Sequence, residues 1–271
     1  MNYTLSEARK IFKNAKGVSF VRVGEVELRS LIYDDNKMMY SNAGFYGDND
    51  ALLSWKKKYM SSIVNADLLM NVYTCNSFTI TSKLLMDVGL FKDTIPYWEE
   101  DLSFWLDVLD DIADIKQEIG IISYFADEMK SQQKHMAKGL IHNRKISNKF
   151  SYIQTYNTCG GGPHKDFFET LEIMKKKIDK STADYFLVSC GCYGLLLCDY
   201  IKDKGKNAIY VGGQLQLLFG LKGARWDERK NIAKLYNKYW KYPNKKPKNY
   251  KTIEGGCYWE GTEDSKGGDF T

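Results

Sequence analysis

The sequence is poor in residues that mark linkers, disulfide frameworks and histidine-based metal sites. Its 271 residues include four prolines, six cysteines and three histidines. No Pro/Gly/Ser-rich segment divides the chain, so we expect one compact unit. No run of about 18 apolar residues occurs, and segment 1–17 lacks the apolar stretch of a signal peptide. We therefore expect a cytoplasmic protein without a transmembrane segment.

The cysteines and histidines follow no known ligand pattern. Cys190, Cys192 and Cys198 fall in an apolar region, which indicates buried, reduced thiols, and no Cys or His pair at zinc spacing matches them. The histidines are far apart and form neither HxxxH nor HExxH. GxSxG and protein-kinase signatures are also missing. These absences argue against zinc hydrolases, nucleophile-elbow hydrolases and protein kinases.

Basic residues concentrate near the C-terminus, although the net charge of +5 is mild. Between Lys230 and Lys251, lysines alternate with tyrosines and Trp240, a mixture that can bind polyanions. Spacing over Asp227–Lys241 is partly helical, and a loop follows at Pro243–Pro247, which favours a solvated basic face. No nucleic-acid-binding signature is present, so we expect no nucleic-acid partner.

One segment predicts a strand, a glycine turn, a helix and a second strand, at Tyr185–Cys190, Gly191–Gly194, Leu195–Lys204 and Ala208–Val211. The second strand stops at Gly212-Gly213. Because the carboxyl ends of parallel strands meet at one edge of a sheet, we expect both glycine turns there, where open α/β folds bind ligands.

Backbone N–H groups at the start of a helix lack partners within it, and the helix dipole favours phosphate there. The sequence GCYG has neither GxGxxG nor GK[ST], so a purely structural connector stays an alternative. The candidate nucleotide-binding positions in the two turns are Gly191, Cys192, Tyr193, Gly194, Gly212, Gly213 and Gln214.

Strands that alternate with helices predict an α/β fold with a Rossmann-like, mostly parallel sheet flanked by helices. We expect a single domain over residues 1–259, with a mostly helical insertion at about 50–150. Within this insertion we expect a strand at Leu68–Thr74 and a strand or buried turn at Ile119–Phe125. Residues 260–271 are expected to form a flexible tail. Oligomeric state stays open.

A pair of carboxylates follows the first predicted strand, Val18–Val23. That strand ends at Gly24, and Glu25 and Glu27 begin a helix, with Arg22 just before them. Carboxylates at i and i+2 face different ways on an ideal helix, but at a strand end they can converge on Mg²⁺, Mn²⁺ or sugar hydroxyls. Acids that only complement the helix dipole are the alternative.

The stretch VSFVRVGEVELRSLI resembles the N-terminal strand-turn-helix of GT-D fold glycosyltransferases, where an Arg-x-Gly-Asp-Gly-Glu pattern is associated with nucleotide-sugar and metal binding. Arg22, Gly24, Glu25 and Glu27 occupy those places, with Glu25 for the family's Asp and Val26 for its usual Gly. The stretch SCGCYGLLLCDYIKDKGKNAIYVGG is similar to the family's second ligand-binding unit. The resemblance implies sugar transfer from a nucleotide sugar to a glycan or other acceptor, with Mn²⁺ or Mg²⁺ as cofactor.

An inverting transfer needs a base that takes the acceptor proton. The candidates are Asp34, Asp35, Asp101, His164 and Glu169. We single out Asp34 and His164 as catalytic candidates beside Glu25 and Glu27, and His164 stands out because it follows a glycine loop.

Two other functions stay open. An S-adenosylmethionine-dependent methyltransferase can use the same strand-turn-helix, but Gly212-Gly213-Gln214 replaces the acidic residue expected after its second strand. A non-catalytic nucleotide- or glycan-binding module would keep the glycine turns without turnover.

Overall fold

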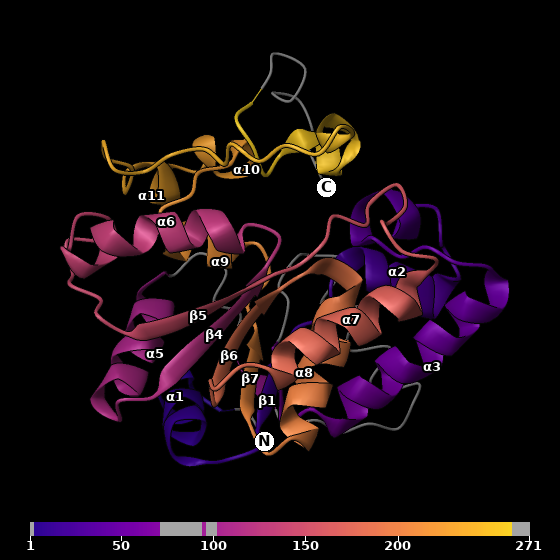
Figure 1. Cartoon of the computed structure of the whole chain (residues 1–271), viewed down its shortest axis with the longest axis horizontal. Helices are drawn as coiled ribbons and strands as arrows, with labels where there is room; N and C mark the ends of the chain where they lie inside the picture. The colour runs from indigo at the N-terminus through magenta and orange to yellow at the C-terminus, as the bar shows by residue number, and fades with distance from the viewer. Residues whose placement is uncertain (1–2, 71–93, 96–101, 262–271) are drawn as a thin grey trace.

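The computed structural model describes residues 3–70, 94–95 and 102–261. Its centre is a seven-stranded parallel sheet of order β3-β2-β1-β7-β6-β4-β5 (Figure 1). The strands are β1 (Ser19–Val21), β2 (Leu68–Met70), β3 (Thr94–Ile95), β4 (Glu118–Ser123), β5 (Lys149–Gln154), β6 (Tyr185–Ser189) and β7 (Asn207–Tyr210). This is a Rossmann-like α/β fold, so the predicted fold class is confirmed.

Helices cover both faces of the sheet (Figure 1). One face carries α2 (Glu25–Tyr33), α3 (Asn49–Asn65), α7 (Phe167–Asp179) and α8 (Gly194–Asp203). The other carries α1 (Leu5–Asn14), α5 (Leu102–Asp114), α6 (Ala126–Ala137) and α9 (Gln214–Leu218). Shorter elements are η1 (Met39–Ala43), η2 (Gly191–Tyr193), α10 (Ala224–Asp227), α11 (Lys230–Ala233), η3 (Tyr250–Thr252) and η4 (Glu254–Gly256).

Strand side chains alternate between two hydrophobic clusters, one on each face. In β6, Leu187 packs into the cluster that holds α5 residues, whereas Phe186 and Val188 pack into the cluster that holds α8 residues. Strands covered on both faces are largely apolar, which explains why β1, β6 and β7 could be predicted from the sequence. Among the described helices, none is both long and apolar enough to cross a lipid bilayer.

The strand order changes direction at the centre of the sheet, where β7 lies between β1 and β6. The carboxyl ends of these three strands are therefore neighbours at one edge. Open α/β folds bind ligands at such a point. The segments that follow β1, β6 and β7 are those selected from the sequence, so the topology brings them together.

The structure corrects or completes the sequence prediction in three places, and a fourth prediction lies mostly outside the described residues. The region at about 50–150, predicted as a mostly helical insertion, holds α3, α5 and α6 and supplies β2, β3 and β4 to the common sheet. Strands β2 and β4 overlap the segments predicted at 68–74 and 119–125, of which residues 71–74 lie outside the described residues, whereas β3 was not predicted. Strand β5 escapes prediction because it is an edge strand with one buried residue. The helix suggested over Asp227–Lys241 is limited to α11 and the end of α10, because Trp240 turns into the core and donates to the Ile141 carbonyl (3.1 Å). Most of the predicted tail, residues 262–271, lies outside the described residues.

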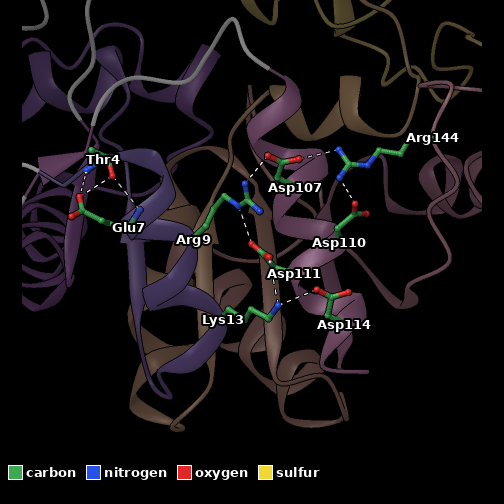
Figure 2. Close-up of polar contacts among 9 residues, drawn as sticks. All are labelled: Thr4, Glu7, Arg9, Lys13, Asp107, Asp110, Asp111, Asp114 and Arg144. Atoms are coloured by element: carbon green, nitrogen blue, oxygen red, sulfur yellow. Dashed lines mark hydrogen bonds and ion pairs between the residues drawn. The ribbon is translucent and has the colours of Figure 1, made fainter.

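A network of ion pairs joins α1 and the loop after α6 to α5 (Figure 2). Its members are Arg9, Lys13, Arg144, Asp107, Asp110, Asp111 and Asp114. Arg9 bridges two turns of α5, because Nη1 lies 2.6 Å from Asp107 and Nε lies 2.8 Å from Asp111. Asp107 also accepts from Arg144 (3.0 Å). Shared charges make this a network rather than a set of isolated surface pairs.

Replacing Arg9 with glutamine is expected to lower the free energy of unfolding by about 1 kcal/mol, because a connected surface network contributes at the upper end of the range for exposed ion pairs. Urea unfolding should show the loss at about 0.05 M NaCl and a smaller loss at about 0.5 M, where the pairs are screened. Lys10→Gln, at an exposed position of the same helix, is the matched control and should change little. Equal losses in both variants would contradict the assignment.

Candidate ligand-binding site

The glycine turn after β7 lies against the arginine that follows β1. Gly212 has φ +70°, and a Cβ added there would lie 2.8 Å from both Nε and Nη2 of Arg22. Glycine therefore suits both the left-handed backbone and the close approach of the guanidinium group. Cζ of Arg22 also lies 5.9 Å from the centroid of the Tyr210 ring. The guanidinium group that follows β1 therefore packs against the glycine turn that follows β7. We call these residues the arginine–glycine surface.

A second guanidinium group, from Arg225 of α10, lies against the next glycine. A Cβ at Gly213 would lie 3.6 Å from its Nη1. Its Cζ lies 5.3 Å from the Trp226 ring centroid and 5.1 Å from that of Tyr258, so two aromatic rings orient it. Guanidinium groups bind phosphate oxygens through several N–H donors in one plane. Two adjacent glycines with one guanidinium each therefore suit a ligand with two phosphates.

Glu27 is the buried carboxylate of this site, with 5% of its surface exposed. Its side chain folds back over Gly24, where an added Cβ would collide with Oε2. Burial raises the pKa of Glu27 to about 7; the nearby Arg22 opposes this shift and Glu254 adds to it. The hydroxyl of Tyr59, on α3, is fully buried, and its pKa is raised by burial and then by Glu27. Glu27 thus ionises close to neutral pH.

Glu25 and Glu27 do not face one ion. Residues two apart on an α-helix are rotated by about 200°, and Glu25 is exposed while Glu27 is buried. Within the described part of the chain, no group of three or more His, Cys, Asp or Glu residues is arranged to hold a metal ion. Of the two carboxylates, Glu27 is the one that lies beside Arg22 and Gly24.

The turn at η4 contributes a second carboxylate, Glu254. Its Oε2 lies 3.4 Å from Nη1 of Arg225, and the hydroxyl of Tyr258 donates to Oε1 at 2.8 Å. The backbone N–H of Ala224 donates to the carbonyl of Trp259, and that of Arg225 donates to the carbonyl of Cys257. These bonds fix the turn beside α10. Glu254 itself has φ +45° and is half-buried. The turn at 254–259, which is distant from β7 in the chain, therefore lies beside Arg225.

The glycine turn after β6 lies mostly beneath this surface. Cys192, Tyr193 and Gly194 are buried, and a Cβ at Gly194 would collide with the Tyr210 ring. Gly191 is exposed, and its carbonyl accepts from the Tyr210 hydroxyl at 3.1 Å. Of the residues predicted to contact phosphate at this turn, Gly191 is therefore the exposed one. The others are buried, and Gly194 packs against the Tyr210 ring.

Gln214 occupies a buried position next to the second turn. Its Oε1 accepts from the indole N–H of Trp105 at 2.9 Å, which ties α9 to α5. Two thiols lie near the carboxylates of the site. Burial raises the pKa of Cys159 to about 12, with Glu254 and Glu27 adding to the shift, and burial also raises the pKa of Cys192 well above its usual value. The five cysteines in the described residues are free, and Cys75 lies outside them.

The base candidates near α2 lie away from this group. Asp34 ends α2 with φ +53°, has a side chain that is 81% exposed, and pairs with Lys56. Asp35 follows it and accepts from Arg29 at 2.9 Å. Both are therefore at the opposite end of α2 from Glu27.

The remaining base candidates belong to the loop before α7 and to its first turn. His164 Nδ1 lies 2.8 Å from the Thr170 hydroxyl, and its ring packs on Tyr156 with centroids 4.7 Å apart. Glu169 accepts from the backbone N–H of Lys165 at 2.7 Å. Among the described residues, no contact joins these side chains to the arginine–glycine surface. Asp101 lies outside the described residues.

No protein-family model and no curated protein matches this chain. Among solved structures, it is similar to the selenomethionine-substituted structure of domain of unknown function 1792 (DUF1792). The TM-score is 0.52 at 14% sequence identity, and the match covers 98% of this chain and 92% of that chain. At this identity, the likeness establishes a shared fold.

Sequence reasoning did not identify Arg225, Glu254, Tyr258 or Tyr59 as site residues. The signal that points to the C-terminal turn is the sequence Glu-Gly-Gly-Cys-Tyr-Trp at 254–259, where two glycines allow consecutive left-handed residues. Its position beside Gly213 depends on tertiary packing.

Proposed function

We propose that the protein is a glycosyltransferase that moves a sugar from a nucleotide-sugar donor to a hydroxyl group of an acceptor. The observation that carries this proposal is the Gly212-Gly213 turn, which has Arg22 on one residue and Arg225 on the next, beside the buried carboxylate of Glu27. A nucleotide sugar has two adjacent phosphates that match two guanidinium groups. The resemblance of residues 22–27 to the GT-D pattern supports the same donor class.

In this reaction, the acceptor oxygen forms a bond to the anomeric carbon, and the bond from that carbon to the diphosphate oxygen breaks. The nucleoside diphosphate leaves with the bonding electrons, and fixed guanidinium groups stabilise the charge that develops on it. Glu27 contacts the donor sugar, and a Mg²⁺ or Mn²⁺ ion bound with the donor would be held by Glu27 and supply Lewis-acid stabilisation. The acceptor proton passes to a carboxylate base, for which Glu254 joins the candidates.

Nucleoside diphosphates are expected to stabilise the protein. UDP or GDP at about 100 times its Kd adds about 3 kcal/mol, which raises the melting temperature by about 5 °C or more. Arg22→Gln and Arg225→Gln should each lower the affinity for UDP or GDP at least about tenfold, because each removes a charge-assisted contact to phosphate. The rise in melting temperature at a given nucleotide concentration is then smaller. Thermal melting with UDP, GDP, UDP-sugars and GDP-sugars, with and without Mn²⁺, measures this.

Arg29→Gln is the matched control, because Arg29 is on the outer part of α2 and pairs with Asp35. It should leave nucleotide stabilisation unchanged. S-adenosylmethionine should give no stabilisation, which separates this function from methyl transfer. Release of UDP or GDP from the stabilising nucleotide sugar separates an enzyme from a binding module. A protein that no nucleoside diphosphate or nucleotide sugar stabilises would rule out the proposal.

A further inference from the structure

The C-terminal part of the chain carries much more positive charge than the one guanidinium group, that of Arg225, which the proposed donor site uses. We call residues 222–251 the basic strip. It holds nine lysines, two arginines, one aspartate and one glutamate, a net charge of +9. Since the whole chain carries +5, all other residues together carry −4. The positive charge is therefore segregated onto one segment, an arrangement that attracts anionic ligands.

Aromatic rings orient the lysines of the basic strip. Nζ of Lys222, Lys245 and Lys246 lies 5.0 to 5.4 Å from the centroids of tyrosine rings. A ring holds an ammonium group without cancelling its charge. Among the described residues, Lys241 is the strip lysine that pairs with a carboxylate, that of Glu128 at 3.4 Å. The charge of Lys241 is therefore partly offset by a carboxylate, and the other strip lysines contribute most of the positive potential of the strip.

The basic strip borders the proposed donor site. In Figure 1, the segment with α10 and α11 crosses the molecule beside α6. Lys245 lies over Tyr124, which directly follows β4, and its carbonyl accepts from the Trp259 indole at 2.9 Å. Arg225, which lies against Gly213, belongs to the same segment. Lysine side chains and donor-binding residues therefore share the carboxyl edge of the sheet.

We propose that the acceptor carries phosphate groups and that the basic strip binds them. This inference rests on the proposed function, since it names the acceptor class of that reaction. Ammonium groups bind phosphate as point charges, and the tyrosine rings between them offer flat faces to sugar rings. The phosphates belong either to a soluble sugar-phosphate chain or to lipid headgroups, and the two present the same chemistry to the strip.

Binding of two phosphate probes tests the proposal. Soluble inorganic polyphosphate and vesicles with phosphatidylglycerol in phosphatidylcholine represent the two sources, and polyglutamate is a polyanion without phosphate. The full chain is expected to bind at least one phosphate probe at about 0.1 M NaCl, with affinity that falls as salt rises. The triple variant Lys245→Gln, Lys246→Gln and Lys248→Gln should lose affinity at least about tenfold, because three exposed charges are removed.

The matched control removes three exposed lysines from α3 and α7: Lys57→Gln, Lys58→Gln and Lys176→Gln. It should keep wild-type affinity, and melting temperatures check that both triple variants fold. Vesicle binding alone assigns a lipid-linked acceptor, and polyphosphate binding alone assigns a soluble one. The inference is overturned if neither phosphate probe binds, if polyglutamate binds equally well, or if both triple variants lose the same affinity.

Nucleotide stabilisation separates this inference from the proposed function. The strip variant should keep its response to UDP or GDP, because its substitutions lie outside the arginine–glycine surface. A protein stabilised by nucleotide but without strip-dependent phosphate binding keeps the transferase proposal and loses this inference. A protein that binds polyphosphate but no nucleotide loses the transferase proposal and, with it, the acceptor role of the strip.

Discussion

Replacing Glu27 with glutamine is expected to raise the free energy of unfolding by about 3 kcal/mol at about pH 8 and by less than about 1 kcal/mol at about pH 5. The reason is the raised pKa of the buried carboxyl, about 7 in the folded protein against a usual value of 4.5. Glutamine keeps the shape of the side chain and cannot ionise. Urea unfolding of both proteins across this pH range measures the difference.

The sign follows from proton binding. Between pH 4.5 and 7 the folded protein holds a proton on Glu27 that the unfolded chain has released, so stability falls as pH rises through this window. Glu27→Gln removes that fall. Glu25→Gln, at an exposed position on the same helix turn, is the control and should leave the pH dependence of stability as in the wild type. A variant that is destabilised at both pH values would contradict the burial of an ionisable Glu27.

Such a result would bear on function as well as stability. A buried carboxylate that ionises near neutral pH lowers the stability of the fold. Such groups are common in binding and catalytic sites, where function requires them. Under the proposed function, Glu27→Gln should therefore gain stability at neutral pH and lose sugar transfer.

The sequence was informative where burial is complete. Strands β6 and β7 are largely apolar and are followed shortly by Gly191 and Gly212, so both their existence and their common edge could be predicted. Strand β5 lies at the edge of the sheet, and its half-exposed residues do not form such a run. In the middle of the chain, β2 and β4 could be placed from their apolar residues, whereas β3 could not, because it is two residues long.

The candidate site shows a similar division. Arg22 and Glu27 could be chosen because they directly follow a strand, but their spacing did not reveal that Glu25 is exposed while Glu27 is buried. Arg225 and Glu254 come from a segment whose position is fixed by backbone hydrogen bonds between residues far apart in the chain. No local pattern encodes that pairing, so only the folded structure brings the second guanidinium group to Gly213.

Replacing Gly212 with alanine is expected to lower the free energy of unfolding by about 1 to 2 kcal/mol and to lower the affinity for nucleoside diphosphates at least about tenfold, as Arg22→Gln does. The left-handed backbone costs a residue with Cβ about 1 to 2 kcal/mol. The Cβ also overlaps the end of a flexible side chain, which must move to make room. That side chain is Arg22, whose guanidinium atoms lie 2.8 Å from the new Cβ. Displacement of Arg22 removes one of the two phosphate-binding groups.

Gly205→Ala separates the two causes, because Gly205 has φ +71° but a Cβ there meets no atom within 4 Å. It carries the backbone strain of Gly212→Ala without the contact to Arg22. We expect a loss of about 1 to 2 kcal/mol in urea unfolding and an unchanged response to UDP or GDP. If Gly212→Ala keeps the wild-type response to UDP or GDP, as Gly205→Ala does, then the Arg22 guanidinium group does not need glycine at position 212 to bind phosphate. The donor site must then lie elsewhere on the sheet edge.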